Sequence, residues 1–266
     1  MQRERIWLYE MTILCIETST SVCSAAICKD GAPLKQYICY EGSNHARLLP
    51  RYIEELLAFA REQGLAIEAV ALSEGPGSYT GLRIGTSTAK GLCYGLNVPL
   101  IPVPTLDILV ENYKLHNLQF TIHNSQSAES RQPSVVLLPM IDARRMEVYT
   151  EVPSDQVPSD QVDRVNRAKA VVVESEDSIL SPSFEEWDGE RLPVYYFGDG
   201  AAKCQSVLTS PNWHFVPGIV PEAQYMGALA ESRQLSAISH QQLAYYEPYY
   251  LKEFIAAQSH VKGLKS

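Results

Sequence analysis

The sequence lacks the residue patterns of a metalloenzyme, of a disulfide-bonded protein and of a membrane protein. Its six cysteines include no C-x-x-C pair. Its six histidines include no H-E-x-x-H motif and no two at the spacing of metal ligands on one helix. No apolar run is as long as a membrane-spanning helix. We therefore expect no bound metal, no membrane association and a reduced, cytoplasmic compartment.

Positive charge is also scarce, since 22 lysines and arginines face 31 aspartates and glutamates, for a net charge of −9. This balance argues against a protein that binds nucleic acid on its own, because such proteins carry a basic face. An RNA site shared with a basic partner stays open. With 266 residues, 45% of them hydrophobic, the chain can form one large domain or two modest ones.

The first half of the chain predicts an α/β domain. Short apolar runs bounded by turn residues predict strands, and longer runs with helical periodicity predict helices. The predicted order of three strands, helix, strand, helix, strand and helix is that of a ribonuclease-H-like domain. The predicted strands cover 11–17, 22–28, 34–40, 67–74 and 98–103, and the helices cover 43–63, a segment after 78, and 105–113.

Polar segments divide the rest of the chain. Residues 115–133 are predicted to be a linker, and the tandem VPSDQ repeat at 152–161 suits an exposed loop. Further strands are predicted at 134–141, 147–152, 170–173 and 194–197, with helices after Gly198-Asp199-Gly200-Ala201 and over 223–232. The predicted organisation is an N-terminal extension (1–10), a first lobe (11–114), the linker (115–133) and a smaller second lobe with a C-terminal segment (134–266).

The stretch Ser73–Gly95 (SEGPGSYTGLRIGTSTAKGLCYG) contains the densest run of glycines. Gly75-Pro76-Gly77 predicts a tight turn, and Ser78 or Thr80 can cap the helix that follows. Helical spacing then gathers small residues on one face. In one interpretation, the turn and the helix N-terminus bind an anion, or the small face receives a second helix. In the other, the turn only joins strand to helix and the small face packs on the protein's own sheet. The phosphate-binding patterns G-x-G-x-x-G and G-K-[ST] are not matched.

Three other places carry candidate chemistry. Glu17 precedes Thr18-Ser19-Thr20 at a strand end, where it could face a nucleotide phosphate, or the hydroxyls could satisfy their own turn. Asp142, Arg144 and Glu147 surround a predicted hairpin, as an acid–base set or as a solvated turn with an Arg–carboxylate pair. His45 begins a predicted helix and suits a capping or surface role. Spacing alone reveals no catalytic constellation.

Four segments resemble the bacterial TsaB (YeaZ) family, in the order found in that family. They are IETSTSVCSAAI (16–27), SEGPGSYTGLRIGTSTAKGL (73–92), IDARRMEVYT (141–150) and EPYYL (247–251). The resemblance implies an ASKHA fold of the actin-like ATPase and ribonuclease-H-like type. Such a fold has two related lobes, with a mixed five-stranded sheet and helices in the first lobe. It also implies a role in making threonylcarbamoyladenosine in tRNA, beside the anticodon.

In that pathway the resemblance assigns catalysis to a paralogue, TsaD, and ATP hydrolysis to TsaE. The two metal-binding histidines of TsaD fall on Thr105 and Leu109 here, and neither side chain replaces an imidazole. Glu17 stands where ATP-binding relatives have Asp, which weakens magnesium–phosphate binding. The resemblance thus implies a non-catalytic scaffold that needs no cofactor and no metal and meets tRNA only through the complex. The alternative is an ASKHA-type nucleotide hydrolase or kinase acting alone.

The resemblance also implies that the first two long helices bind the same helices of TsaD, or of a second copy, through an overlapping surface. On this basis Gly85→Leu is expected to weaken binding to TsaD far more than the fold. If the small face packs on its own sheet, the reverse is expected. The interface candidates are His45, Leu48, Leu49, Tyr52, Ile53, Leu56, Gly81, Gly85, Thr88 and Ala89. Candidates for weak anion or nucleotide binding are Thr18, Ser19, Gly77 and Ser78.

Overall fold

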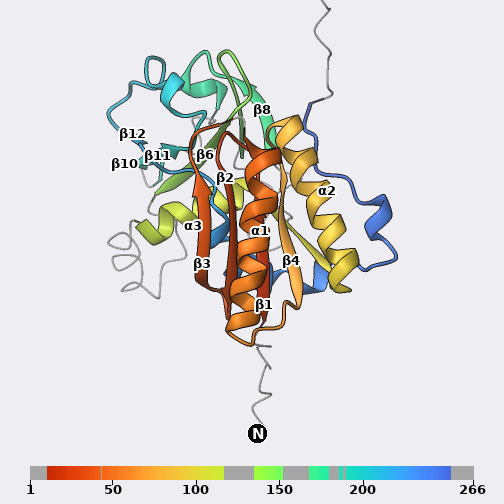
Figure 1. Cartoon of the computed structure of the whole chain (residues 1–266). Coiled ribbons are helices and arrows are strands. Elements are labelled where there is room, and N and C mark those ends of the chain that lie inside the picture. The colour runs from red at the N-terminus through yellow and green to blue at the C-terminus, as the bar shows by residue number, and fades with distance from the viewer. Residues whose placement is uncertain are drawn as a thin grey trace, which may run out of the picture.

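Two five-stranded sheets make up the core of the protein, as shown by a computed structural model (Figure 1). The structure describes residues 11–42, 44–116, 135–151, 168–179, 186–187 and 190–252. The predicted extension 1–10 and the VPSDQ repeat lie outside these ranges, as does the predicted linker apart from residues 115–116.

The first sheet has the strand order β3-β2-β1-β4-β5. Its first three strands are antiparallel, and β4 and β5 continue the sheet in parallel with β1. The predicted order of elements in this half of the chain is confirmed, with boundaries that move by one to three residues. The strands are β1 (Thr12–Glu17), β2 (Cys23–Lys29), β3 (Ala32–Cys39), β4 (Ala69–Gly75) and β5 (Leu100–Pro104).

Helices α1 (His45–Glu62) and α2 (Tyr79–Leu96) cover one face of this sheet and lie next to each other (Figure 1). Both are amphipathic, and their apolar sides meet the sheet in one core cluster. Ser78 caps α2 as predicted, because its hydroxyl accepts a hydrogen bond from the Gly81 amide. The buried residues that the two helices contribute are Leu49, Ile53, Leu56, Ala89 and Cys93.

The second sheet repeats the pattern of the first, with the order β12-β11-β6-β7-β8. Strands β6, β7 and β8 are antiparallel, and β11 and β12 continue in parallel with β6. The predicted two-lobe α/β architecture is therefore confirmed. The strands are β6 (Val136–Asp142), β7 (Glu147–Glu151), β8 (Ala168–Val172), β11 (Val194–Phe197) and β12 (Trp213–Val216), and β9 (Glu186–Trp187) pairs with β10 (Glu190–Arg191) apart from this sheet.

Helix α3 (Thr105–His116) packs against both sheets. Its Ile108 belongs to the core cluster on the second face of the first sheet, whereas Leu109 and Tyr113 pack against the second sheet. The ring of Tyr113 stacks on that of Phe197 at 4.7 Å between centroids. A helix that is apolar on opposite sides is expected where two layers meet, and it joins the two sheets through a shared core.

The segment that follows β12 returns to the first sheet. Met226 and Ala230 are buried against it, and the backbone of Ile238 pairs with Leu100 of the edge strand β5. The predicted helix 223–232 is in fact a 3-10 turn and a short helix, and the predicted helix after Ala201 is a single 3-10 turn. These elements are η4 (Ala223–Tyr225), α6 (Gly227–Ser232) and η3 (Ala202–Cys204), and the other 3-10 turns are η2 (Glu176–Ser178), η5 (Gln234–Ser236) and η6 (Leu243–Tyr245).

This return bears on the division of the chain into lobes, which stays a prediction. The segment 223–246 follows the second sheet in sequence but packs on the first. None of the helices in the described ranges is long and apolar enough to cross a lipid bilayer.

Candidate functional site

The turn after β1 packs directly on the start of α2. The hydroxyl of Thr18 donates a hydrogen bond to the carbonyl oxygen of Gly81 at 2.9 Å. The amide of Ser78 donates to the carbonyl oxygen of Ser19 at 2.6 Å. A Cβ atom added to Gly81 would overlap the Thr18 carbonyl oxygen, and one added to Gly85 would overlap the Thr18 hydroxyl. Glycine is therefore needed here because two backbone segments approach each other closely.

This contact corrects the sequence-based interface. Gly81, Gly85 and Ala89 are buried against the protein's own first lobe, so the prediction that they receive a partner helix is wrong. Of the predicted small face, Thr88 is half-buried, and its hydroxyl donates to the Ile84 carbonyl oxygen at 2.8 Å. Helical periodicity identified a face of small residues correctly but could not say which neighbour lies against it.

The same turn contains the residues of the predicted anion site. Thr18 and Ser19 are fully buried, and their hydroxyls already donate to protein oxygens. A Cβ on Gly77 would overlap the Ser19 carbonyl oxygen, and the Ser78 hydroxyl caps α2. The hydroxyls of the turn therefore bind the protein itself, and phosphate binding by these four residues stays a prediction.

Glu17 ends β1 beneath this turn and is completely buried. Its Oε1 accepts hydrogen bonds from the amide and the hydroxyl of Ser19, each at 2.5 Å. Its Oε2 has no hydrogen-bond partner among the described residues. Burial raises the pKa of this carboxyl to about 7, although the Ser19 bonds oppose the shift. A side chain in this position holds the turn and is shielded from solvent.

The second sheet has a corresponding but more open strand end. Asp142 ends β6, its amide donates to Asp199 at 3.0 Å, and its carboxylate pairs with Lys203. Glu147, across the hairpin, pairs with Lys252. The cations of this turn thus come from lysines far away in sequence, which spacing could not reveal. Such partly exposed ion pairs brace a hairpin and contribute little to stability.

A comparison with known proteins identifies the family. Residues 41–257 match the model of the TsaD family, tRNA N6-adenosine threonylcarbamoyltransferase. The TsaB biosynthesis protein of Haemophilus influenzae is 27% identical over 92% of this chain and 95% of its own length. TsaB of Bacillus subtilis is 32% identical over 53% of this chain and 54% of its own length. YeaZ of Pseudomonas aeruginosa has a related structure, with a TM-score of 0.62, 25% identity and coverage of 91% of this chain and 100% of its own.

The chain belongs to the TsaB (YeaZ) family. Proteins of that name act in tRNA threonylcarbamoyladenosine biosynthesis. The resemblance seen in four sequence segments is therefore confirmed over nearly the whole chain.

The two residues that the resemblance aligns with metal ligands of TsaD lie in the core of this TsaB-family protein. Thr105 and Leu109, on the first two turns of α3, are completely buried, and Leu109 packs between the sheets. Asp107, midway between them in the sequence, pairs with Arg233 at 2.9 Å. No group of three metal-ligating side chains occurs in the described part of the chain. The donor set at this place, a hydroxyl and a leucine, does not fit a transition metal.

The interface candidates on α1 also divide between core and surface. Leu49, Ile53 and Leu56 are buried on the first sheet, so they are not available to a partner. His45 is buried as well, and its Nε2 lies 3.0 Å from the Thr20 carbonyl oxygen in the turn after β1. The predicted capping or surface role is therefore wrong, because Asn44 is the N-cap of α1 and, among the described residues, no side chain caps this helix. Leu48 and Tyr52 are half-buried, and the Tyr52 ring stacks on Tyr37 of β3 at 5.5 Å.

The surface that remains open in this TsaB-family protein follows the outer sides of α1 and α2. On α2, nothing lies within 4 Å of a Cβ added to Gly91 or Gly95. Leu57, Ile84 and Leu92 are half-buried and pack on the core beneath. We call these five residues together with Thr88 the α1–α2 surface. Gly91 and Gly95 are exposed, whereas Gly81 and Gly85 of the same helix are buried.

Proposed function

We propose that this protein is the non-catalytic partner of the TsaD transferase in threonylcarbamoyl transfer to tRNA. It binds TsaD through the α1–α2 surface and supports the active state of that enzyme. In this proposal it acts in the cytoplasm without a cofactor of its own, TsaE joins through the complex, and tRNA is met only indirectly.

The observation that carries the proposal is the filling of the catalytic positions. Thr105 and Leu109 are buried side chains that cannot ligate a metal, in a chain whose fold otherwise follows the transferase family. The turn where a nucleotide phosphate would enter is likewise occupied by Thr18 and Ser19. A chain that keeps the fold while its ligand positions are filled by core side chains supports an accessory role.

The α1–α2 surface supports the choice of docking site. It joins half-buried apolar side chains to two exposed glycines on one helix, so a partner helix can approach the α2 backbone closely. Apolar area that is covered only on association favours binding. A second copy of this chain competes for the same surface in this proposal.

The test uses the full chain with its cognate TsaD, TsaE, tRNA, ATP and threonylcarbamoyl donor. We expect modification only when all proteins are present, and neither transfer nor ATP hydrolysis by this chain alone. Size exclusion with and without TsaD measures the heterodimer and homodimer. Turnover by the isolated chain that Glu17→Gln abolishes would favour the hydrolase or kinase alternative.

A matched pair of variants tests the surface. Gly91→Arg adds a long side chain to the α1–α2 surface, and Val172→Arg adds the same charge to β8, where Val172 is 52% exposed. We expect Gly91→Arg to weaken TsaD binding at least about tenfold, or about 1.4 kcal/mol, with the melting temperature unchanged. Val172→Arg should bind as the wild type does. Equal binding by both variants would refute this docking site.

A further inference from the structure

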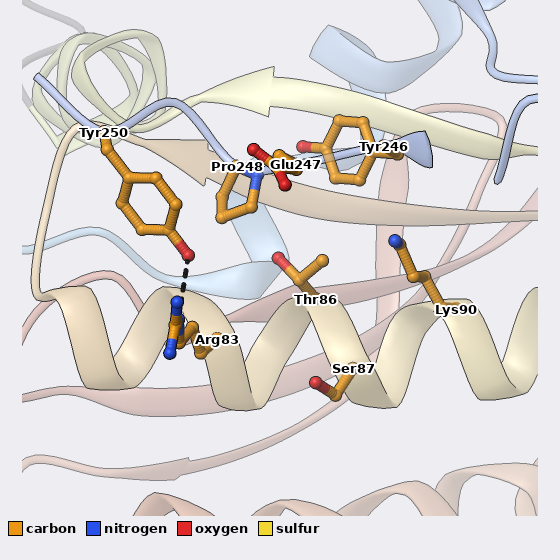
Figure 2. A pocket seen from close by; sticks show the side chains of 8 residues that line it. All are labelled: Arg83, Thr86, Ser87, Lys90, Tyr246, Glu247, Pro248 and Tyr250. Carbon is orange, nitrogen blue, oxygen red and sulfur yellow. Dashed lines mark hydrogen bonds between the residues drawn. The ribbon is translucent and has the colours of Figure 1, made fainter. Parts of the chain in front are cut away.

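A groove lies on the side of α2 that faces away from α1. Its other wall is the segment Tyr246–Tyr250, which runs alongside α2, with Tyr250 near Arg83 and Tyr246 near Lys90 (Figure 2). The cavity measures about 220 Å³. We call Tyr246–Tyr250 the C-terminal strap and the cavity the strap groove. Neither belongs to the α1–α2 surface, and the proposed function assigns no role to them.

The strap is firmly attached to the first lobe. The amide of Tyr249 donates to the Glu74 carbonyl oxygen at 2.7 Å. Pro248 is buried, and the Tyr250 ring lies against the ring of Tyr79 at 4.9 Å between centroids. Both walls of the strap groove are therefore attached to the first lobe.

Two cations stand at opposite ends of the strap groove (Figure 2). Arg83 packs over the Tyr79 ring at 4.3 Å, and its Nε donates to the Tyr250 hydroxyl at 3.4 Å. Lys90 donates to the Ala244 carbonyl oxygen at 3.0 Å. These contacts position both side chains but use few of their N–H groups, since guanidinium has five and ammonium three. Seven residues of helix separate the two by about 10 Å.

Two hydroxyls between the cations are buried without a protein partner. Thr86 is 6% exposed, and its Oγ1 has no hydrogen-bond partner among the described residues. The same holds for the Tyr246 hydroxyl. Figure 2 shows the Thr86 hydroxyl directed toward the strap. Thr88 is a useful contrast, because its hydroxyl donates to the Ile84 carbonyl oxygen in the usual way. Buried hydroxyls without partners are unfavourable, so a hydrogen-bonding group from water or from a ligand is expected opposite these two, at the wall of the strap groove.

The carboxylate of Glu247 also borders the strap groove (Figure 2). Glu247 is exposed, and no ion pair joins it to Arg83 or Lys90 in the described part of the chain. Because it is exposed it can rotate toward solvent. Its negative charge repels an anion in the strap groove and so lowers the affinity for it.

We propose that the strap groove binds a small dianion whose two oxyanion groups, phosphate or carboxylate, contact Arg83 and Lys90 and accept hydrogen bonds from Thr86 and Tyr246. The separation of the two cations favours two anionic groups over one. Phosphate and carboxylate share this chemistry, and the choice between them is left to the probes below.

The experiment is calorimetric titration of the full-length protein at fixed ionic strength with pyrophosphate, succinate and orthophosphate. We expect saturable binding of pyrophosphate or succinate, and weaker binding of orthophosphate, which cannot reach both cations. Preference for pyrophosphate identifies a phosphate ligand, and preference for succinate a carboxylate ligand. Absence of saturable binding by all three probes would overturn the proposal.

Matched variants locate the site. Thr86→Val should weaken binding at least about tenfold while the melting temperature stays the same or rises, because a buried hydroxyl without a partner is removed. Thr88→Val, on the same helix, should bind the probe as the wild type does. Lys90→Met should weaken binding and reduce its salt dependence. Equal effects of Thr86→Val and Thr88→Val would place the ligand elsewhere and overturn the proposal.

Glu247→Gln tests the sign of the ligand charge. Removing this carboxylate should tighten binding of the anionic probe, since a like charge is lost. Weaker binding by Glu247→Gln would show that the carboxylate attracts the ligand, which overturns a dianion. Thr86, Lys90 and Glu247 lie outside the α1–α2 surface, so their variants should bind TsaD as the wild type does, and either proposal can fail alone. Thr88 belongs to that surface, so Thr88→Val serves as a control for anion binding only.

Discussion

Helix α2 carries two pairs of glycines that do opposite things. Gly81 and Gly85 face inward, where any side chain would overlap the backbone or the hydroxyl of Thr18. Gly91 and Gly95 face outward, with nothing within 4 Å of an added Cβ atom. The first pair lets a turn of the first lobe approach α2, and the second leaves a low, open surface beside α1. A glycine-rich helix can thus serve its own fold at one end and be open to a partner at the other.

The difference matters for interpreting the sequence. Each glycine inside a helix lowers helix stability by about 1 kcal/mol relative to alanine, whichever way it faces. At Gly81 and Gly85 that loss is offset by close packing inside the lobe. At Gly91 and Gly95 no close packing in the described chain offsets this loss of helix stability. We therefore expect a binding partner to pack there.

The largest effect is expected for Gly81→Ala. The new methyl would overlap the carbonyl oxygen of Thr18, and a backbone oxygen cannot move without shifting the β1–β2 turn. We expect the free energy of unfolding to fall by at least about 3 kcal/mol, at the upper end for overpacking. Urea unfolding of the wild type and of Gly81→Ala measures this difference in the free energy of unfolding. From the sequence alone, Gly85→Leu is expected to weaken TsaD binding far more than the fold. Because a side chain at Gly85 would overlap the Thr18 hydroxyl, we expect Gly85→Leu to unfold the protein instead.

An effect of similar size on the free energy of unfolding, but one that depends on pH, is expected for the Glu17 carboxyl, which lies beneath Gly81 and Gly85. Burial raises the pKa of Glu17 to about 7 from 4.5. The folded protein therefore holds a proton that the unfolded chain has lost, and stability falls as pH rises through this window. Relative to Glu17→Gln, the free energy of unfolding of the wild type should fall by about 3 kcal/mol between pH 4.5 and about 7, and should fall no further at higher pH. Urea unfolding at several pH values measures the difference.

A carboxyl-to-amide change on the surface is the control for this pH dependence. Asp177 is exposed on η2, so Asp177→Asn should leave the pH dependence of unfolding as in the wild type. If Glu17→Gln and the wild type give parallel curves, the buried carboxyl does not hold its proton in the folded state.

The smallest effect, and the opposite sign, is expected for Gly91→Ala. An exposed helical glycine replaced by alanine should raise the free energy of unfolding by up to about 1 kcal/mol. Thermal and urea unfolding beside Gly81→Ala complete the comparison. A loss of stability in Gly91→Ala would mean that the outward pair is packed, which would break the distinction between the two pairs.

The sequence predicted the elements of the first lobe well because each has a strong local signal. Strands β1, β2, β4 and β5 are short apolar runs, and α1 and α2 have long periodic patterns. The end of the chain was predicted less well. Residues 223–232 form two short pieces because the segment follows the shape of the first sheet, which no local pattern encodes.

The candidate site was predicted in its residues but not in its contacts. The glycine stretch, Glu17 and the Thr18-Ser19 turn were all singled out from the sequence. Their mutual contact was not, because Thr18 and Gly81 are 63 residues apart. Likewise, Lys203 and Lys252 could not be matched to Asp142 and Glu147 without the fold.

The sequence by itself determined the family, the order of the elements in the first lobe and the presence of Thr105 and Leu109 at the start of α3, because these depend on residue identity at fixed positions. The tertiary structure alone decided which side of α2 is buried. A helix repeats every 3.6 residues, so the pattern gives the faces of a helix but not its neighbours. The pairing of β1 with β4 in the sheet places the Thr18 turn against α2. That pairing therefore decides that Gly81 and Gly85 are packed against the turn while Gly91 and Gly95 stay exposed.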